Sequence, residues 1–250
     1  MINIWGSDIN YTPDYWPLWL VILAVLAALT LAGVAGHFML RKVLAPKREA
    51  AGEHKLYLYS LPVRVWHWLN ALLFAVLLAT GLTNHFDPSP MLVKIHHIAG
   101  QVFVAVWIYF IVINIVTGNG KHYLIQLSGF TGRIIRQGMF YLFGIMKGEA
   151  HPFHSSETCK FNPLQQVAYV GVVYLLMPIL AVSGLLALYP EFMGLAGMKG
   201  IVVRVHLAFG VISLIFIIAH LYLCTCGGYM TQLLKGMIDG YHREDTTEKH

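Results

Sequence analysis

Four histidines are the side chains of this chain whose type and spacing best suit cofactor chemistry. His206 and His220 stand fourteen residues apart in the apolar run VRVHLAFGVISLIFIIAHLYL, and His67 and His96 lie in two earlier apolar runs. On an α-helix, fourteen residues make about 3.9 turns and rise about 21 Å, so the two rings leave the helix within roughly 40° of one direction. That rise covers most of a hydrocarbon core of about 30 Å. One such helix can therefore present a ligand to each of two stacked cofactors.

The composition is typical of a polytopic membrane protein. Hydrophobic residues make up 57% of the chain and charged residues 12%, with a mean hydropathy of +0.63, against about 25% charged residues in an average soluble domain. The net charge of +5 is spread over short loops rather than gathered on one face, which argues against a nucleic-acid partner. The three cysteines show neither CxxC nor CxxCH spacing, so we expect no disulfide framework and no covalent c-type haem. We expect Cys224 and Cys226, at a helix end, to face lipid.

Five apolar segments are long enough to cross a membrane. They are residues 17–40, 65–83, 96–117, 165–188 and 202–226. The first is too long for the apolar core of a secretory signal and no Lys or Arg precedes it, so we expect a retained helix. Its start carries an aromatic interface belt of Tyr11, Tyr15, Trp16 and Trp19. The pattern over 129–149 predicts a helix on the membrane surface, and the polar residues from Tyr241 onward are expected to be disordered.

The basic residues orient these spans. The loops 41–64 and 118–164 and the C-terminal tail together hold fourteen Lys and Arg, whereas the segments on the other side hold three. Because basic loops stay in the cytoplasm, the N-terminus is predicted to lie outside and the C-terminus in the cytoplasm.

With this orientation, depth alone pairs the four histidines. His96 and His206 lie near the outer face, and His67 and His220 lie near the cytoplasmic face. Each pair can supply both axial ligands to one haem iron. The sequence therefore predicts two non-covalent b-type haems, one at each face, and a chain that carries electrons across the membrane.

Small and basic residues accompany the predicted ligands. Gly100 and Gly210 each follow an outer ligand by four residues, and Gly81 lies at the same depth on the second span, where a porphyrin plane needs backbone clearance. Three cations precede a ligand by two or three residues and are candidates to bind haem propionates: Arg64, Lys94 and Arg204. A single cation at a helix end is explained equally well as an anchor at the membrane interface.

Alternatives exist for the histidines too. A single intramembrane histidine more often makes an interhelical hydrogen bond than a metal bond, and it is the matched depth of four that favours ligands. His97 is adjacent to His96 and points about 100° away, which makes it a fallback ligand. The remaining histidines lie at helix ends or in loops and are expected to be solvated, among them His37 and His151.

Several segments resemble one known family. Ser60–Gly81 (SLPVRVWHWLNALLFAVLLATG), Ile95–Phe103 (IHHIAGQVF), Lys160–Gln165 (KFNPLQ) and the helix with His206 and His220 are similar to landmarks of the di-haem cytochrome b subunits of membrane-bound Ni-Fe hydrogenases, formate dehydrogenases and thiosulfate reductases. The resemblance covers about residues 57–235, and the family's axial ligands fall on His67, His96, His206 and His220.

The resemblance implies an all-α membrane fold in which a four-helix haem-binding transmembrane bundle carries one extra N-terminal transmembrane helix. Residues 1–50 would be a periplasmic segment and that extra helix, residues 51–236 the di-haem core, and residues 237–250 a polar cytoplasmic tail. It also implies a pocket for a quinone (menaquinone or ubiquinone) beside the cytoplasmic haem, with Asn162 and Gln165 facing it. From the residues alone, Asn162-Pro163 is explained as well by a helix cap.

Together these observations predict a multi-pass cytochrome of the bacterial inner membrane. It would pass electrons between quinone and an extracytoplasmic iron–sulfur or multihaem cytochrome c subunit. No molybdenum, nickel or iron–sulfur ligation motif is present, so substrate chemistry would belong to a separate catalytic subunit. A metal or proton transporter would need acidic residues within the spans, and there are none. A non-redox membrane anchor of a larger complex is a further alternative, and it would purify colourless.

Overall fold

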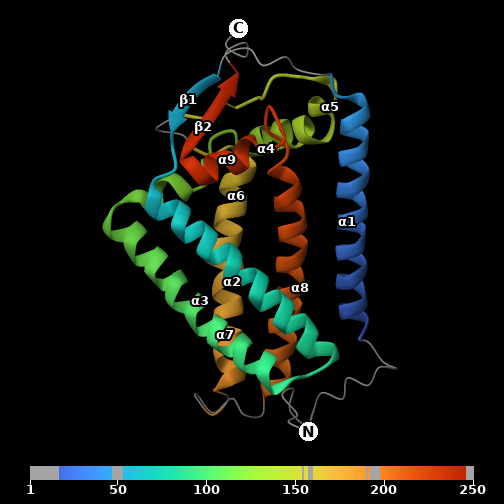
Figure 1. The fold of residues 1–250 in the computed structure, drawn as a ribbon, viewed down its shortest axis with the longest axis vertical. Coiled ribbons are helices and arrows are strands. Elements are labelled where there is room, and N and C mark those ends of the chain that lie inside the picture. The colour runs from blue at the N-terminus through green and yellow to red at the C-terminus, as the bar shows by residue number, and fades with distance from the viewer. Residues whose placement is uncertain are drawn as a thin grey trace. The chain divides into compact units, whose positions relative to one another are not determined.

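The computed structural model describes residues 17–46, 53–153, 155–156, 160–189, 191 and 198–245. Its long helices are α1 (Leu18–Leu44), α2 (Leu61–Phe86), α3 (Pro90–Val116) and α8 (Lys199–Leu223), together with a composite helix, Pro163–Leu188 (Figure 1). Within the described residues, these are the five helices long and apolar enough to cross a membrane. The prediction of an all-α membrane protein with five spans is confirmed. The interface residues Tyr11, Tyr15 and Trp16 lie outside the described ranges.

Two helices begin earlier than the apolar patterns predicted. α2 starts at Leu61 rather than near residue 65, and α3 starts at Pro90 rather than at residue 96. Proline in a first helical turn costs nothing, because the amide hydrogen it lacks would have no partner there. Both helices therefore begin before the predicted spans, and His67 and His96 lie more than one turn inside them.

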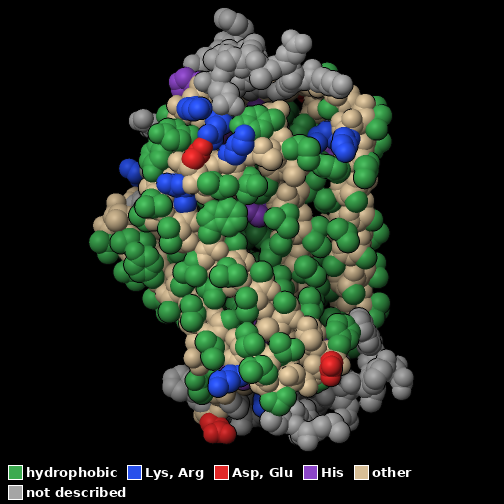
Figure 2. Space-filling model, in the orientation of Figure 1, with side chains coloured by type: hydrophobic (Ala, Val, Ile, Leu, Met, Phe, Trp, Pro, Cys, Tyr) green, Lys and Arg blue, Asp and Glu red, His purple; other side chains and the backbone are tan. Residues whose placement is uncertain are grey.

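The helices keep much of their apolar surface exposed. Only 6% of the apolar window of α1 is buried, against 28% for Pro163–Leu188. On the face shown in Figure 2, hydrophobic side chains cover the helices, and charged side chains gather near helix ends. Exposed apolar surface of this extent is what a lipid environment requires.

The chain packs as two compact units, and the long helices run through both. Unit 1 contains the described residues up to Leu29, together with His67–Ile113 and Val172–Phe216. Unit 2 contains Thr30–Trp66, Asn114–Gly171 and the residues from Ile217 onward.

Unit 1 contains a buried apolar cluster that joins two of its helices. Leu20 on α1 lies in one buried apolar cluster with Leu207 and Val211 on α8. The composite helix consists of α6 (Pro163–Gly171), the π-helix η3 (Val172–Leu176) and α7 (Met177–Leu188). Pro178 has no amide hydrogen to donate to the helix backbone, and the π-helix ends two residues before it. Within that turn, the Val173 carbonyl accepts a hydrogen bond from Trp107 Nε1 at 2.8 Å.

Unit 2 contains the short elements: η1 (Asn119–Tyr123), α4 (Phe130–Met139), the π-helix η2 (Phe140–Gly144), α5 (Ile145–Lys147), α9 (Gln232–Asp239), β1 (Glu53–Tyr57) and β2 (Tyr241–Asp245). The helix predicted over 129–149 is present as α4, η2 and α5. It is bounded by Gly129 and Gly148, whose φ angles of 61° and 70° place them in the left-handed region that glycine adopts without strain.

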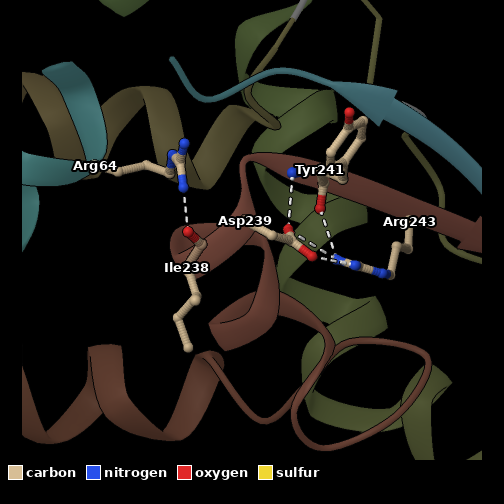
Figure 3. Close-up of polar contacts among 5 residues, drawn as sticks. All are labelled: Arg64, Ile238, Asp239, Tyr241 and Arg243. Carbon is tan, nitrogen blue, oxygen red and sulfur yellow. Dashed lines mark hydrogen bonds and ion pairs between the residues drawn. The ribbon is translucent and has the colours of Figure 1, made fainter. Parts of the chain in front are cut away.

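The C-terminal tail differs from the prediction. Residues 241–245 were expected to be disordered, but they form β2, which pairs antiparallel with β1 so that Tyr57 faces Tyr241 and Lys55 faces Arg243 (Figure 1). Asp239 stabilises the turn before β2, because it accepts hydrogen bonds from Arg243 and from the Tyr241 amide (Figure 3). The prediction was wrong because it weighed local polarity, whereas the strand gains its partner from a distant segment.

Candidate functional site

Two of the four predicted ligands face one another in unit 1. His96 on α3 and His206 on α8 have ring centroids 6.1 Å apart with their planes at 83°. A metal ion bound by a nitrogen of each ring would lie roughly 2 Å from each nitrogen. Adding the distance from each nitrogen to the centre of its ring gives a centroid separation of this size. The spacing therefore suits one metal ion held between the two imidazoles.

Each ring is held from behind by a hydroxyl on a neighbouring helix. Thr80 Oγ1 on α2 lies 2.9 Å from His96 Nδ1, and Ser183 Oγ on α7 lies 3.0 Å from His206 Nδ1. In both rings the hydrogen-bonded atom is Nδ1, which leaves Nε2 as the nitrogen for a metal.

An apolar cavity surrounds the two rings. Its lining includes Phe74, Leu77, Phe103, Leu180, Leu207 and Val211, together with Gly81, Gly100, Gly184 and Gly210. A Cβ added at Gly210 would meet nothing within 4 Å, and one at Gly100 would meet only Leu77 at 3.9 Å, so both leave open space beside the ligands. Paired imidazoles within an apolar, glycine-lined cavity fit a b-type haem.

Gly81 lines the cavity and also makes room for a histidine ring. A Cβ at Gly81 would lie 3.1 Å from His96 Cε1. Gly184, which the sequence analysis did not single out, stands in the same relation to His206 Cε1, also at 3.1 Å. The fallback ligand His97 also borders the cavity, but the ring that faces His206 is that of His96.

The predicted cytoplasmic pair divides between the two units. His67 lies in unit 1, where its ring makes an edge contact with Trp68 at 5.4 Å. His220 lies in unit 2, with Nε2 3.7 Å from the thiol of Cys224. The pairing of His67 with His220 stays a prediction.

The three predicted propionate cations have different surroundings. Lys94 and Arg204 are exposed near the starts of α3 and α8. Arg64 is half-buried near the start of α2 and donates a hydrogen bond to the backbone carbonyl of Ile238 (Figure 3). In this structure the Arg64 guanidinium therefore fastens α2 to the end of α9.

The two predicted quinone residues form a capping box at the start of α6. Asn162 Oδ1 accepts the Gln165 amide at 2.9 Å, and Gln165 Oε1 accepts the Asn162 amide at 3.0 Å. The helix-cap interpretation thus accounts for both carbonyl oxygens. Asn162 Nδ2 remains a donor and lies 3.3 Å from the Tyr141 hydroxyl. Burial raises the pKa of Tyr141 to about 12, so that hydroxyl keeps its proton.

The sequence analysis missed two polar clusters in unit 2. In one, Gln137 is fully buried and donates to His151 Nε2 at 3.3 Å, so the expectation that His151 is solvated was wrong. The signal was available, since Gln137 lies on the apolar face of an amphipathic segment.

The second cluster fastens α1 within unit 2. His37 contacts the Tyr222 hydroxyl and lies 3.0 Å from the Leu142 carbonyl, so this histidine is not simply solvated. Arg41 donates to Cys226 Sγ and Thr225 Oγ1, both at 3.0 Å. Cys226 is buried, and the prediction that it faces lipid was wrong.

Comparison with known proteins identifies relatives over most of the chain. It is 47% identical over 241 residues to a putative cytochrome, YdhU, of Escherichia coli K12, covering 94% of this chain and 92% of that protein. It is 26% identical over 228 residues to a probable Ni/Fe-hydrogenase B-type cytochrome subunit of Rhizobium leguminosarum bv. viciae, covering 77% of this chain and 90% of that protein. No solved structure matches the chain.

A family profile described as prokaryotic cytochrome b561 matches residues 58–240. That span includes His96 and His206 and four of the five membrane-spanning helices, all but α1. The chain is accordingly a multi-pass protein of the bacterial inner membrane with b-type haem and a role in transmembrane electron transfer, and it belongs to the prokaryotic cytochrome b561 family.

Proposed function

We propose that this cytochrome carries electrons between a redox subunit at the outer face of the membrane and a quinone near the cytoplasmic face, through two b-type haems with two histidine ligands each. The observation that carries the proposal is the facing pair of His96 and His206, with both Nδ1 atoms hydrogen-bonded and a glycine-lined cavity around them.

We infer the second haem from helix geometry. His220 is fourteen residues beyond His206 on the continuous helix α8, a rise of about 21 Å, and depth in the sequence assigns His67 as its partner. When bound, a haem supplies an iron that takes up and releases single electrons. The residues of the chain hold the ligands in place and keep water from the outer site with an apolar lining.

The propionates would be bound by cations near the helix ends. Lys94 and Arg204 are the candidates for the outer haem, since both are exposed close to its ligands. Arg64 is the candidate for the cytoplasmic haem, and it would then share its guanidinium between a propionate and the Ile238 carbonyl.

The chain functions within a larger complex, as hydrogenase-type cytochrome relatives indicate. We assign the outer partner to the class of iron–sulfur or multihaem cytochrome c subunits that accompany a separate catalytic subunit. The cytoplasmic end would exchange electrons with menaquinone or ubiquinone.

Substitution of the ligands tests the haem assignment. His96→Ala and His206→Ala should each remove the same haem, while His97→Ala should keep both, because only the first two rings face one another. Redox-titrated absorption spectra of purified protein report each haem separately. Loss of different haems from the first two variants, or loss of a haem from His97→Ala, would contradict the pairing.

Asn162 offers a separate test of the quinone pocket. Asn162→Ala removes both the helix cap and the Nδ2 donor, whereas Asn162→Ser removes the donor and keeps a good N-cap. A buried hydrogen bond to a neutral partner is worth about 0.5–1.5 kcal/mol, so both variants should slow the reduction of haem by added quinol by about 2- to 12-fold. Full activity in Asn162→Ser would show that Asn162 is only a helix cap.

A further inference from the structure

The two hydroxyls behind the ligand pair form a repeated arrangement. Thr80 lies against His96, and Ser183 lies against His206, with hydroxyl-to-Nδ1 distances of 2.9 and 3.0 Å. In each case the next residue is the glycine that makes room for the same ring, Gly81 or Gly184. A hydroxyl followed by glycine therefore occurs once on α2 and once on α7, each time facing a histidine of the following span.

The direction of these hydrogen bonds follows from where each hydroxyl proton lies. Thr80 Oγ1 donates to the Val76 carbonyl at 2.6 Å, and Ser183 Oγ donates to the Ile179 carbonyl at 2.5 Å. A hydroxyl has one proton, so towards the histidine it can only accept. Both Nδ1 atoms must then carry the hydrogen.

Each hydroxyl therefore holds its ring with the lone pair of Nε2 free for a metal.

We propose that Thr80 and Ser183 are positioning residues for the outer haem. They fix the Nδ1–H tautomer of His96 and His206, set the direction of Nε2, and make both imidazoles better electron donors by accepting their N–H. The inference rests on the proposed function, because it takes these two histidines as the axial ligands. A more basic ligand favours ferric over ferrous iron, so both hydroxyls lower the reduction potential of the outer haem.

The test removes each hydroxyl while keeping side-chain size. Thr80→Val and Ser183→Ala should raise the midpoint potential of the outer haem and leave the other haem unchanged. Haem titration into apoprotein should show 10- to 100-fold weaker binding at the outer site, the loss seen when hydrogen-bond partners of metal ligands are removed. The conservative variants Thr80→Ser and Ser183→Thr keep the acceptor and should restore both values.

Ser213→Ala is the matched control. Ser213 is buried on α8 and lines the same cavity, but its hydroxyl donates to the Gly210 carbonyl at 2.7 Å. The inference is overturned if Thr80→Val and Ser183→Ala shift the outer potential no more than Ser213→Ala does, or if the conservative variants fail to restore it. Retention of both haems by His96→Ala and His206→Ala would instead refute the proposed function itself.

Discussion

Gly184 is predicted to be the position where one added methyl group disturbs the outer site most directly. In Gly184→Ala the new Cβ would lie 3.1 Å from His206 Cε1 and 3.5 Å from Nδ1. Ordinary van der Waals contact begins near 3.4 Å, so the ring must retreat by a few tenths of an ångström. Overpacking of this kind costs about 1–3 kcal/mol, and alanine recovers about 1 kcal/mol of helix propensity. Both terms act on folding, so the free energy of unfolding of the apoprotein should fall by about 0–2 kcal/mol. The displaced His206 ring should also weaken haem binding.

Two matched glycines separate this effect from others. Gly33 on α1 has nothing within 4 Å of an added Cβ, so Gly33→Ala should gain about 1 kcal/mol of helix propensity without overpacking and should leave haem binding unchanged. Gly210 also has open space in the protein but lines the cavity, so Gly210→Ala should leave the apoprotein stable and weaken haem binding. Apoprotein unfolding in detergent and haem titration report the two quantities separately. If Gly184→Ala behaves like Gly33→Ala in both assays, the placement of His206 against Gly184 is wrong.

Further predictions concern unit 2. Hydrogen bonding to Arg243 holds the pKa of Asp239 at about 2, so the carboxylate stabilises β2 above its unfolded pKa near 3.9, and that contribution is lost as pH falls from about 4 to 2. The protection factors of the β1–β2 amides, which correct for the intrinsic pH dependence of exchange, should fall over that window and, in Asp239→Asn, be low at neutral pH as well. Unchanged protection would contradict the assignment. Arg41→Met removes hydrogen bonds to Cys226 and Thr225 and should lower the free energy of unfolding by about 1.5–3 kcal/mol. Lys42 is the exposed neighbour, and Lys42→Met should leave the free energy of unfolding unchanged. Equal losses in both variants would argue against the role of Arg41 in fastening α1.

The five spans and the outer histidine pair could be read from the sequence because each depends on local information. A run of twenty apolar residues is sufficient to predict a span, and the positions of His96 and His206 along their spans set their depth. In the structure their rings face one another, as the matched depth predicts.

What the sequence did not reveal depends on how helices rotate about their axes and which segments meet. Thr80 and Ser183 are ordinary residues of apolar helices until their neighbours are known, since a hydroxyl that donates to its own helix is common in membranes. The β1–β2 pairing joins segments nearly two hundred residues apart, and no local pattern predicts such a partner. The role of Arg41 in fastening α1 could not be predicted either, because its partners Cys226 and Thr225 are distant in the sequence.

The haem content of the purified protein tests the central claim most directly. A pyridine haemochrome assay, made before and after extraction with acidified acetone, gives the number of haems per chain and shows whether they are covalently attached. Four histidine ligands in two pairs predict two haems of the b type per chain, both extractable and both low-spin. One haem per chain, or haem that stays with the protein after extraction, would contradict the account.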